Sequence, residues 1–136
     1  QERYYYKLVR DVKKTLPLAK EINRAVIETY EYLQTLPNDK ARTRHIKMVE
    51  KGLKEQYTPR MKKLTFAQGK LLIKLVNREC NQSSYQLVKA FMGPFKAGFY
   101  QAFAALFGAS LKKEYHPDDE DKMIERIVTL VENGQL

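Results

Sequence analysis

Polar side chains stand at positions where the hydrophobic pattern predicts burial. Across residues 64–79 the apolar residues recur at the helical period of 100° per residue, and Gln68 and Glu79 fall on the same arc. Gln68 also follows Thr65 by three residues, which is the spacing of a capping box. Two interpretations remain open: Gln68 completes a cap while Glu79 lies at a solvated helix end, or both residues join a buried polar network.

A third polar residue, Gln101, stands on the small-residue face of a helix expected over 94–107. An unpaired buried amide costs about 1–3 kcal/mol, so we expect Gln101 to hydrogen bond across a close helix contact. If the chain is an enzyme, its pocket is expected where three consecutive helices bring polar residues together at one end of the bundle. The candidate residues are Gln68, Lys74, Arg78, Glu79, Tyr85, Lys89 and Gln101.

Basic residues form a second pattern, within residues 40–54. Five of them fall within about 80° of one another at the helical period, along a stripe roughly 21 Å long. This basic stripe consists of Lys40, Arg44, Lys47, Lys51 and Lys54. Charged helix faces are commonly just solvated, and Glu50 and Glu55 offset part of this charge. The functional interpretation is a surface for phosphate or acidic groups.

Other catalytic and metal-binding patterns are absent from the sequence. It has no phosphate-binding glycine loop, HExxH, CxxC or nucleophile elbow. Cys80 has no placed base, and His45 has no second ligand beside it, so neither a metal nor a cofactor is expected. The acidic run 118–121 lacks the alternate spacing and the glycine of a calcium loop. Asp118 is instead expected to cap the last helix.

The sequence predicts an all-α fold, a single compact bundle of about six helices in one domain over residues 1–136. Pro17 predicts a kink or break between the first two helices, and Pro59 predicts another. The buried central helix is expected near 94–107. The expected helices cover residues 2–16, 18–36, 39–58, 65–79, 85–92, 94–107 and 118–132, and Gly93-Pro94 separates the fifth from the sixth.

The net charge is +9, and most of it lies in the first half of the chain. Residues 1–63 contain 16 Lys or Arg against 8 Asp or Glu, whereas residues 64–136 contain 9 against 8. An anionic partner is therefore conceivable. No transmembrane segment is expected, because the apolar run 94–107 is short and contains Lys96 and Gln101. Three consecutive tyrosines, 4–6, predict that at least one is exposed.

Many of these positions carry a resemblance to a known family. They are Leu64-Thr65, Gln68-Gly69, Leu71-Leu72, Lys74-Leu75, Arg78-Glu79, Tyr85, Val88-Lys89, Gly93, Gln101, Phe107-Gly108, Leu111-Lys112, Glu114-Tyr115 and Ile124–Val128. The chain resembles, over nearly its whole length, an uncharacterised bacterial family classed as a domain of unknown function. The resemblance implies an exported protein of the periplasm or cell envelope of Gram-negative bacteria, with a further N-terminal segment. It implies no activity, and the chain departs from the family pattern at Met92 and Tyr100.

Three functions are carried forward from the sequence. The leading hypothesis is a non-enzymatic envelope domain that binds an acidic protein or another anionic envelope component through the basic stripe. The first alternative is an enzyme with a small polar pocket around Glu79 and Gln101. The second is a nucleic-acid-binding domain, which the charge permits but the absence of a recognisable binding motif disfavours.

Overall fold

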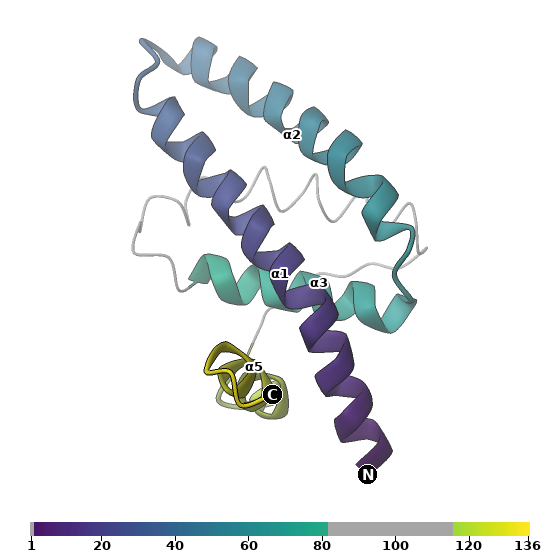
Figure 1. The fold of residues 1–136 in the computed structure, drawn as a ribbon. Coiled ribbons are helices and arrows are strands. Elements are labelled where there is room, and N and C mark those ends of the chain that lie inside the picture. The colour runs from purple at the N-terminus through teal and green to yellow at the C-terminus, as the bar shows by residue number, and fades with distance from the viewer. Residues whose placement is uncertain (1, 82–115) are drawn as a thin grey trace.

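The protein is built from α-helices, as the sequence predicts. The computed structural model describes residues 2–81 and 116–136, and no strand occurs in that part of the chain (Figure 1). Its helices are α1 (Glu2–Leu33), α2 (Asp39–Met61), α3 (Phe66–Asn81) and α5 (Lys122–Glu132). The helices expected over 85–92 and 94–107, including Gln101, lie outside the described residues.

The first helix does not break at Pro17. Residues expected to form two helices make one, α1, which runs for 32 residues through the proline. Pro17 removes one backbone hydrogen bond, but Leu16 and Leu18 on either side of it are both buried, at 3% and 5% exposure. Packing of the flanking leucines thus outweighs the local preference against helix. Pro59 likewise lies inside α2, which ends two residues later at Met61.

The end of α1 comes three residues earlier than the sequence suggests. The chain leaves the helix at Leu33 and turns, with the Leu36 N–H donating to the Leu33 carbonyl at 3.2 Å. Arg42, in the first turn of α2, donates to the same Leu33 carbonyl at 3.4 Å and to the Leu36 carbonyl at 3.2 Å. A side chain from the next helix therefore caps the C-terminus of α1, which local sequence patterns do not reveal.

The core lies where α1 crosses α3 (Figure 1), and this is the most extensive of the helix contacts. Ile127 and Val128 add the apolar face of α5, and the C-terminal end of α2 adds Tyr57 and Met61. Burying one such side chain contributes about 1.5–3 kcal/mol. The buried cluster comprises Val12, Leu16, Leu18, Ala19, Ile22, Tyr57, Met61, Leu64, Leu71, Leu72, Ile73, Leu75, Ile127 and Val128.

Helix α3 is buried on more than its apolar arc. The predicted capping box is confirmed: the Gln68 N–H donates to Thr65 Oγ1, and the Thr65 N–H donates to Gln68 Oε1, both at 3.1 Å. Asn77 and Arg78, which fall outside or at the border of the apolar arc at the helical period, are nevertheless only 2% and 4% exposed. Charged side chains of α5 cover Arg78.

The caps of α2 and α5 match the sequence only in part. Of the two residues before and at the start of α2, Asn38 and not Asp39 is the cap, accepting a hydrogen bond from the Ala41 N–H at 2.9 Å. Asp118 does not cap α5, whose N-cap is Asp121. Gly134, with φ of +73°, follows the end of α5, and the Gln135 N–H donates back to the Leu130 carbonyl at 2.9 Å.

Candidate functional site

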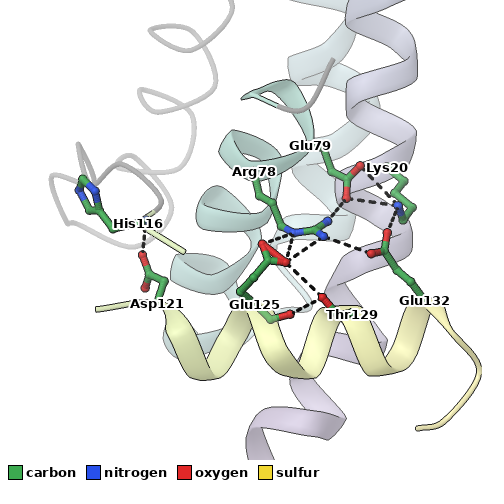
Figure 2. Close-up of polar contacts among 8 residues, drawn as sticks. All are labelled: Lys20, Arg78, Glu79, His116, Asp121, Glu125, Thr129 and Glu132. Carbon is green, nitrogen blue, oxygen red and sulfur yellow. Dashed lines mark hydrogen bonds and ion pairs between the residues drawn. The ribbon is translucent and has the colours of Figure 1, made fainter. Parts of the chain in front are cut away.

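Arg78 lies at the centre of a charged network that joins three helices. Its guanidinium, 5% exposed, makes a two-pronged contact with Glu125 of α5, with Nε 2.9 Å from Oε1 and Nη2 3.0 Å from Oε2 (Figure 2). Nη1 donates to Glu79 at 2.8 Å, and Nη2 also reaches Glu132 at 3.1 Å. Arg suits this position because its planar fork can meet several carboxylates at once.

Lys20 of α1 closes the network from the opposite side. Its Nζ lies 2.7 Å from Glu132 Oε2 and 3.3 Å from Glu79 Oε1 (Figure 2). Two cations and three carboxylates therefore meet in what we call the Arg78 network. Its members are Lys20, Arg78, Glu79, Glu125 and Glu132.

Electrostatics in the network favour the charged forms of Arg78, Lys20 and Glu132. Burial by itself lowers the pKa of Arg78 and Lys20, but hydrogen bonds and charges of the neighbouring glutamates outweigh it, and the pKa of both groups is raised. Burial raises the pKa of Glu132, yet the Lys20 hydrogen bond and the Arg78 charge lower it further than burial raises it. These groups consequently stay ionised across the neutral range.

A second polar contact joins α1 to the start of α3. The amide of Gln68 donates to Asp11 Oδ1 at 2.9 Å, and both residues are buried. Arg10 Nε lies 3.7 Å from the same oxygen. Gln68 thus serves the cap and also holds a buried carboxylate, so the two interpretations offered by the sequence are both correct for this residue.

A third contact joins α3 to the residues before α5. Lys74 forms an ion pair with Oδ1 of Asp121, whose side chain is 1% exposed. The His116 N–H donates to Oδ2 of the same carboxylate at 2.9 Å (Figure 2). Asp121 therefore orders the turn 116–121 against α3. Of the acidic residues 118–121, Asp121 is the one that the fold buries.

The structure brings together only part of the predicted polar cluster. Arg78 and Glu79 meet in the Arg78 network, and Glu79 is buried rather than solvated. Gln68 stands ten residues earlier on α3, about 15 Å along the axis, and binds Asp11. Lys74 binds Asp121 between them. Tyr85, Lys89 and Gln101 lie outside the described residues.

Sequence reasoning missed the partners of these residues. The missed partners bind residues of other helices, and they are Asp11, Lys20, Asp121, Glu125 and Glu132. The contacts made by α5 and its N-cap join residues that are 47 to 112 positions apart in the sequence. Charged residues on amphipathic helices usually face solvent, so their types alone gave no signal. The available clue was the presence of a charged residue, Glu79, inside an apolar arc.

The basic stripe lies on the exposed side of α2. Four of its side chains are exposed and have no ion-pair partner within residues 2–81 and 116–136, namely those of Lys40, Arg44, Lys47 and Lys51. Lys40, Arg44 and Lys47 line an open groove of about 450 Å³ together with Asp39 and Thr43. Lys54 also lies in α2. Unlike Lys74 and Arg78 of α3, these four cations have no carboxylate partner among the residues that the structure describes.

Comparisons with known proteins identify the family and no activity. Within residues 2–81 and 116–136, no three His, Cys, Asp or Glu side chains are grouped to hold a metal ion. No helix in those ranges is long and apolar enough to cross a membrane. Neither a curated protein nor a solved structure matches the chain. The family described as Domain of unknown function (DUF4294) matches residues 1–130, and the chain therefore belongs to it.

Proposed function

We propose that this chain is a non-enzymatic helical module of the cell envelope that binds an acidic protein through the basic stripe. The observation that carries the proposal is the contrast between two sets of cations. Arg78, Lys74 and Lys20 are bound to carboxylates of the same chain. The described cations of the stripe are exposed and unpaired, although carboxylates are plentiful elsewhere.

The shape of the stripe also favours a protein partner. A groove beside three of its cations carries Thr43, whose hydroxyl can bond to a peptide backbone, while Asp39 at the same groove is paired with Arg42. Met48, 62% exposed, borders the cations at the helical period and offers an adaptable apolar contact. Apolar contact beside unpaired positive charge fits a protein surface that combines carboxylates with hydrophobic side chains.

The enzyme alternative has weaker support among the described residues. A catalytic acid, base or nucleophile needs an atom free to meet a substrate. Gln68, Lys74, Arg78 and Glu79 each have a partner within the protein. Their arrangement fits cross-linking of helices, so we retain binding as the function.

The test is crosslinking in intact cells with the full-length protein. The stripe variant combines Arg44→Glu, Lys47→Glu and Lys51→Glu, and its control combines Lys13→Glu, Lys14→Glu and Arg24→Glu, which are exposed on α1. Both variants carry the same change in charge. We expect an acidic protein to be recovered with wild type and control but not with the stripe variant.

The same partner, once purified, provides the quantitative measurement. Affinity for the stripe variant should fall at least about tenfold, and the association rate of wild type should fall as salt is added. Equal recovery and equal affinity of the stripe variant would refute the proposal. Tighter binding to DNA or RNA than to any protein, with a steep salt dependence, would favour the nucleic-acid alternative instead.

A further inference from the structure

A pocket separate from the basic stripe lies between the N-terminal part of α1, the start of α3, and α5. Its volume is about 230 Å³, and its apolar lining includes Leu8, Leu71 and Ile124, one from each helix. In Figure 1 the N-terminal end of α1 lies at the opposite end of the molecule from the start of α2, where the stripe begins. The two surfaces are therefore distinct.

Among the described residues, positive charge without a partner exceeds negative charge without a partner at this pocket. Asp11 lines it, but Gln68 and Arg10 already bind that carboxylate. Lys7 and Lys70 also line it, and neither forms an ion pair with a residue in the described part of the chain. The Lys70 ammonium lies 5.4 Å from the centre of the exposed Phe66 ring. The pocket thus offers an apolar floor beside two cations without carboxylate partners.

The size of the pocket decides what kind of occupant it suits. Sites for drug-sized molecules usually measure about 300–1,000 Å³, and this pocket is smaller. A space of this size suits one large apolar side chain from another protein. Tyr4, 62% exposed, lines the pocket, and Phe66, 45% exposed, lies against the lining residue Lys70. Aromatic residues of this kind are typical of interface centres.

We propose that this pocket binds an acidic segment of another protein, which inserts one aromatic or long aliphatic side chain between α1 and α3. Carboxylates on either side of that anchor pair with Lys7 and Lys70. A second copy of this chain is a poorer occupant, because a symmetric contact would bring the same lysines together. The inference does not rest on the proposed role of the basic stripe.

The probe is a library of short random peptides displayed on phage and selected on the full chain. Enriched peptides are synthesised, labelled and titrated by fluorescence anisotropy. We expect them to share one large apolar residue flanked by Asp or Glu. Ala67→Trp, an exposed position that lines the pocket, should weaken binding at least about tenfold by filling the site.

A charge variant tests the same site without filling it. Lys7→Glu with Lys70→Glu should also weaken binding about tenfold, whereas Lys13→Glu with Lys14→Glu makes the same charge change outside the pocket and should preserve binding. The stripe variant should bind the peptides as wild type does. If Ala67→Trp does not fold, as judged by circular dichroism, the two lysine variants decide the matter.

Several results would overturn the inference. The inference is wrong if the selection enriches no peptide. It is also wrong if the enriched peptides lack acidic residues or an apolar anchor. Equal binding by folded Ala67→Trp and by the Lys7, Lys70 variant would exclude the pocket. Loss of peptide binding in the stripe variant would place the contact on α2. If the protein forms a dimer that Ala67→Trp abolishes, the pocket binds a second copy of the chain. If it binds phosphatidylglycerol vesicles and Ala67→Trp abolishes that binding, the pocket binds lipid.

Discussion

Arg78 is a buried cation whose partners all come from its own chain. Its guanidinium contacts Glu79, Glu125 and Glu132 while remaining 5% exposed. A buried ion pair is not by itself strong evidence for stability, because desolvation opposes the attraction. Removing Arg78, however, takes one of two cations from the buried Glu79 and the two-pronged contact from Glu125. Arg78 is therefore the residue at which a substitution should have the largest electrostatic effect on folding.

We expect Arg78→Met to lower the free energy of unfolding by about 1–3 kcal/mol, since the buried Glu79 would lose one of its two cations and Glu125 would lose its two-pronged contact. Arg78→Lys should fall between wild type and Met, because lysine keeps the charge and loses the planar two-pronged contact. Urea titration followed by circular dichroism provides the measurement. Arg24→Met, at an exposed position of α1, is the control and should change stability by less than about 0.5 kcal/mol. Full stability of Arg78→Met would show that the network contributes nothing.

Residue types predicted the local contacts at this scale but not the distant ones. The capping box of Thr65 and Gln68 follows from a spacing of three, and the Asn38 cap from its position before α2. Gln68 to Asp11 spans 57 residues and Arg78 to Glu125 spans 47. No helical period relates such residues, so only the packing of α1, α3 and α5 could bring them together.

At the scale of elements, local rules failed where packing opposed them. The proline rule predicts a kink or break in the first helix, and the break does not occur, because Leu16 and Leu18 keep the residues around Pro17 in the core. Arg42, which belongs to α2, caps the C-terminus of α1 by donating to the Leu33 carbonyl. By contrast, the apolar face of α5 and its glycine stop were predictable, because each depends on residues within one short segment. The local sequence thus predicts well where a helix forms, and less well where that helix ends.

Pro17→Ala should stabilise the protein by about 1–3 kcal/mol. The proline side chain is exposed, so alanine leaves no cavity, and it restores the hydrogen bond to the Lys13 carbonyl. Thermal unfolding measures the gain. Pro37→Ala is the control, since Pro37 lies in the turn between α1 and α2 and its replacement should give no gain. A loss of stability in Pro17→Ala would mean that the packing of α1 on α3 requires a bend at the proline.

At the scale of the whole molecule, the Arg78 network cross-links α1, α3 and α5 through ion pairs. Apolar packing joins α1 to α3, whereas long charged side chains reach from α3 to α5. The association of α5 with the rest should therefore depend on ionisation more than the contact of α1 with α3 does. Lys20 and Glu132, which lie at the outer side of the network, are the groups that report this dependence.

The pH dependence follows from the direction of each pKa shift. Folding lowers the pKa of Glu132 below its ordinary 4.5, so its stabilisation is present above that pH and is lost as pH falls through the lower, folded value. Folding raises the pKa of Lys20 above 10.5, so its stabilisation is present below that pH and is lost as pH rises through the higher, folded value.

We therefore expect the stability difference between wild type and Glu132→Gln to be largest above pH 4.5 and to narrow in stronger acid. The difference for Lys20→Met should be largest below pH 10.5 and narrow in stronger alkali. Urea titrations across this range measure both. Glu28→Gln and Lys13→Met, at exposed positions, are the matched controls and should show no such trend. Differences independent of pH would mean that the two residues act through packing rather than charge.

Burial along α2 is graded from one end to the other. Its C-terminal residues Tyr57 and Met61 belong to the core, while the described residues of the segment 39–53 are exposed or only half-buried. Local opening costs least free energy where few apolar groups are buried, so backbone amides near the basic stripe should exchange with solvent faster than those of α3. A partner bound to the basic stripe would slow hydrogen exchange of these amides. The bound surface would therefore be detectable as protection of α2 amides, without any change in the exchange of core amides.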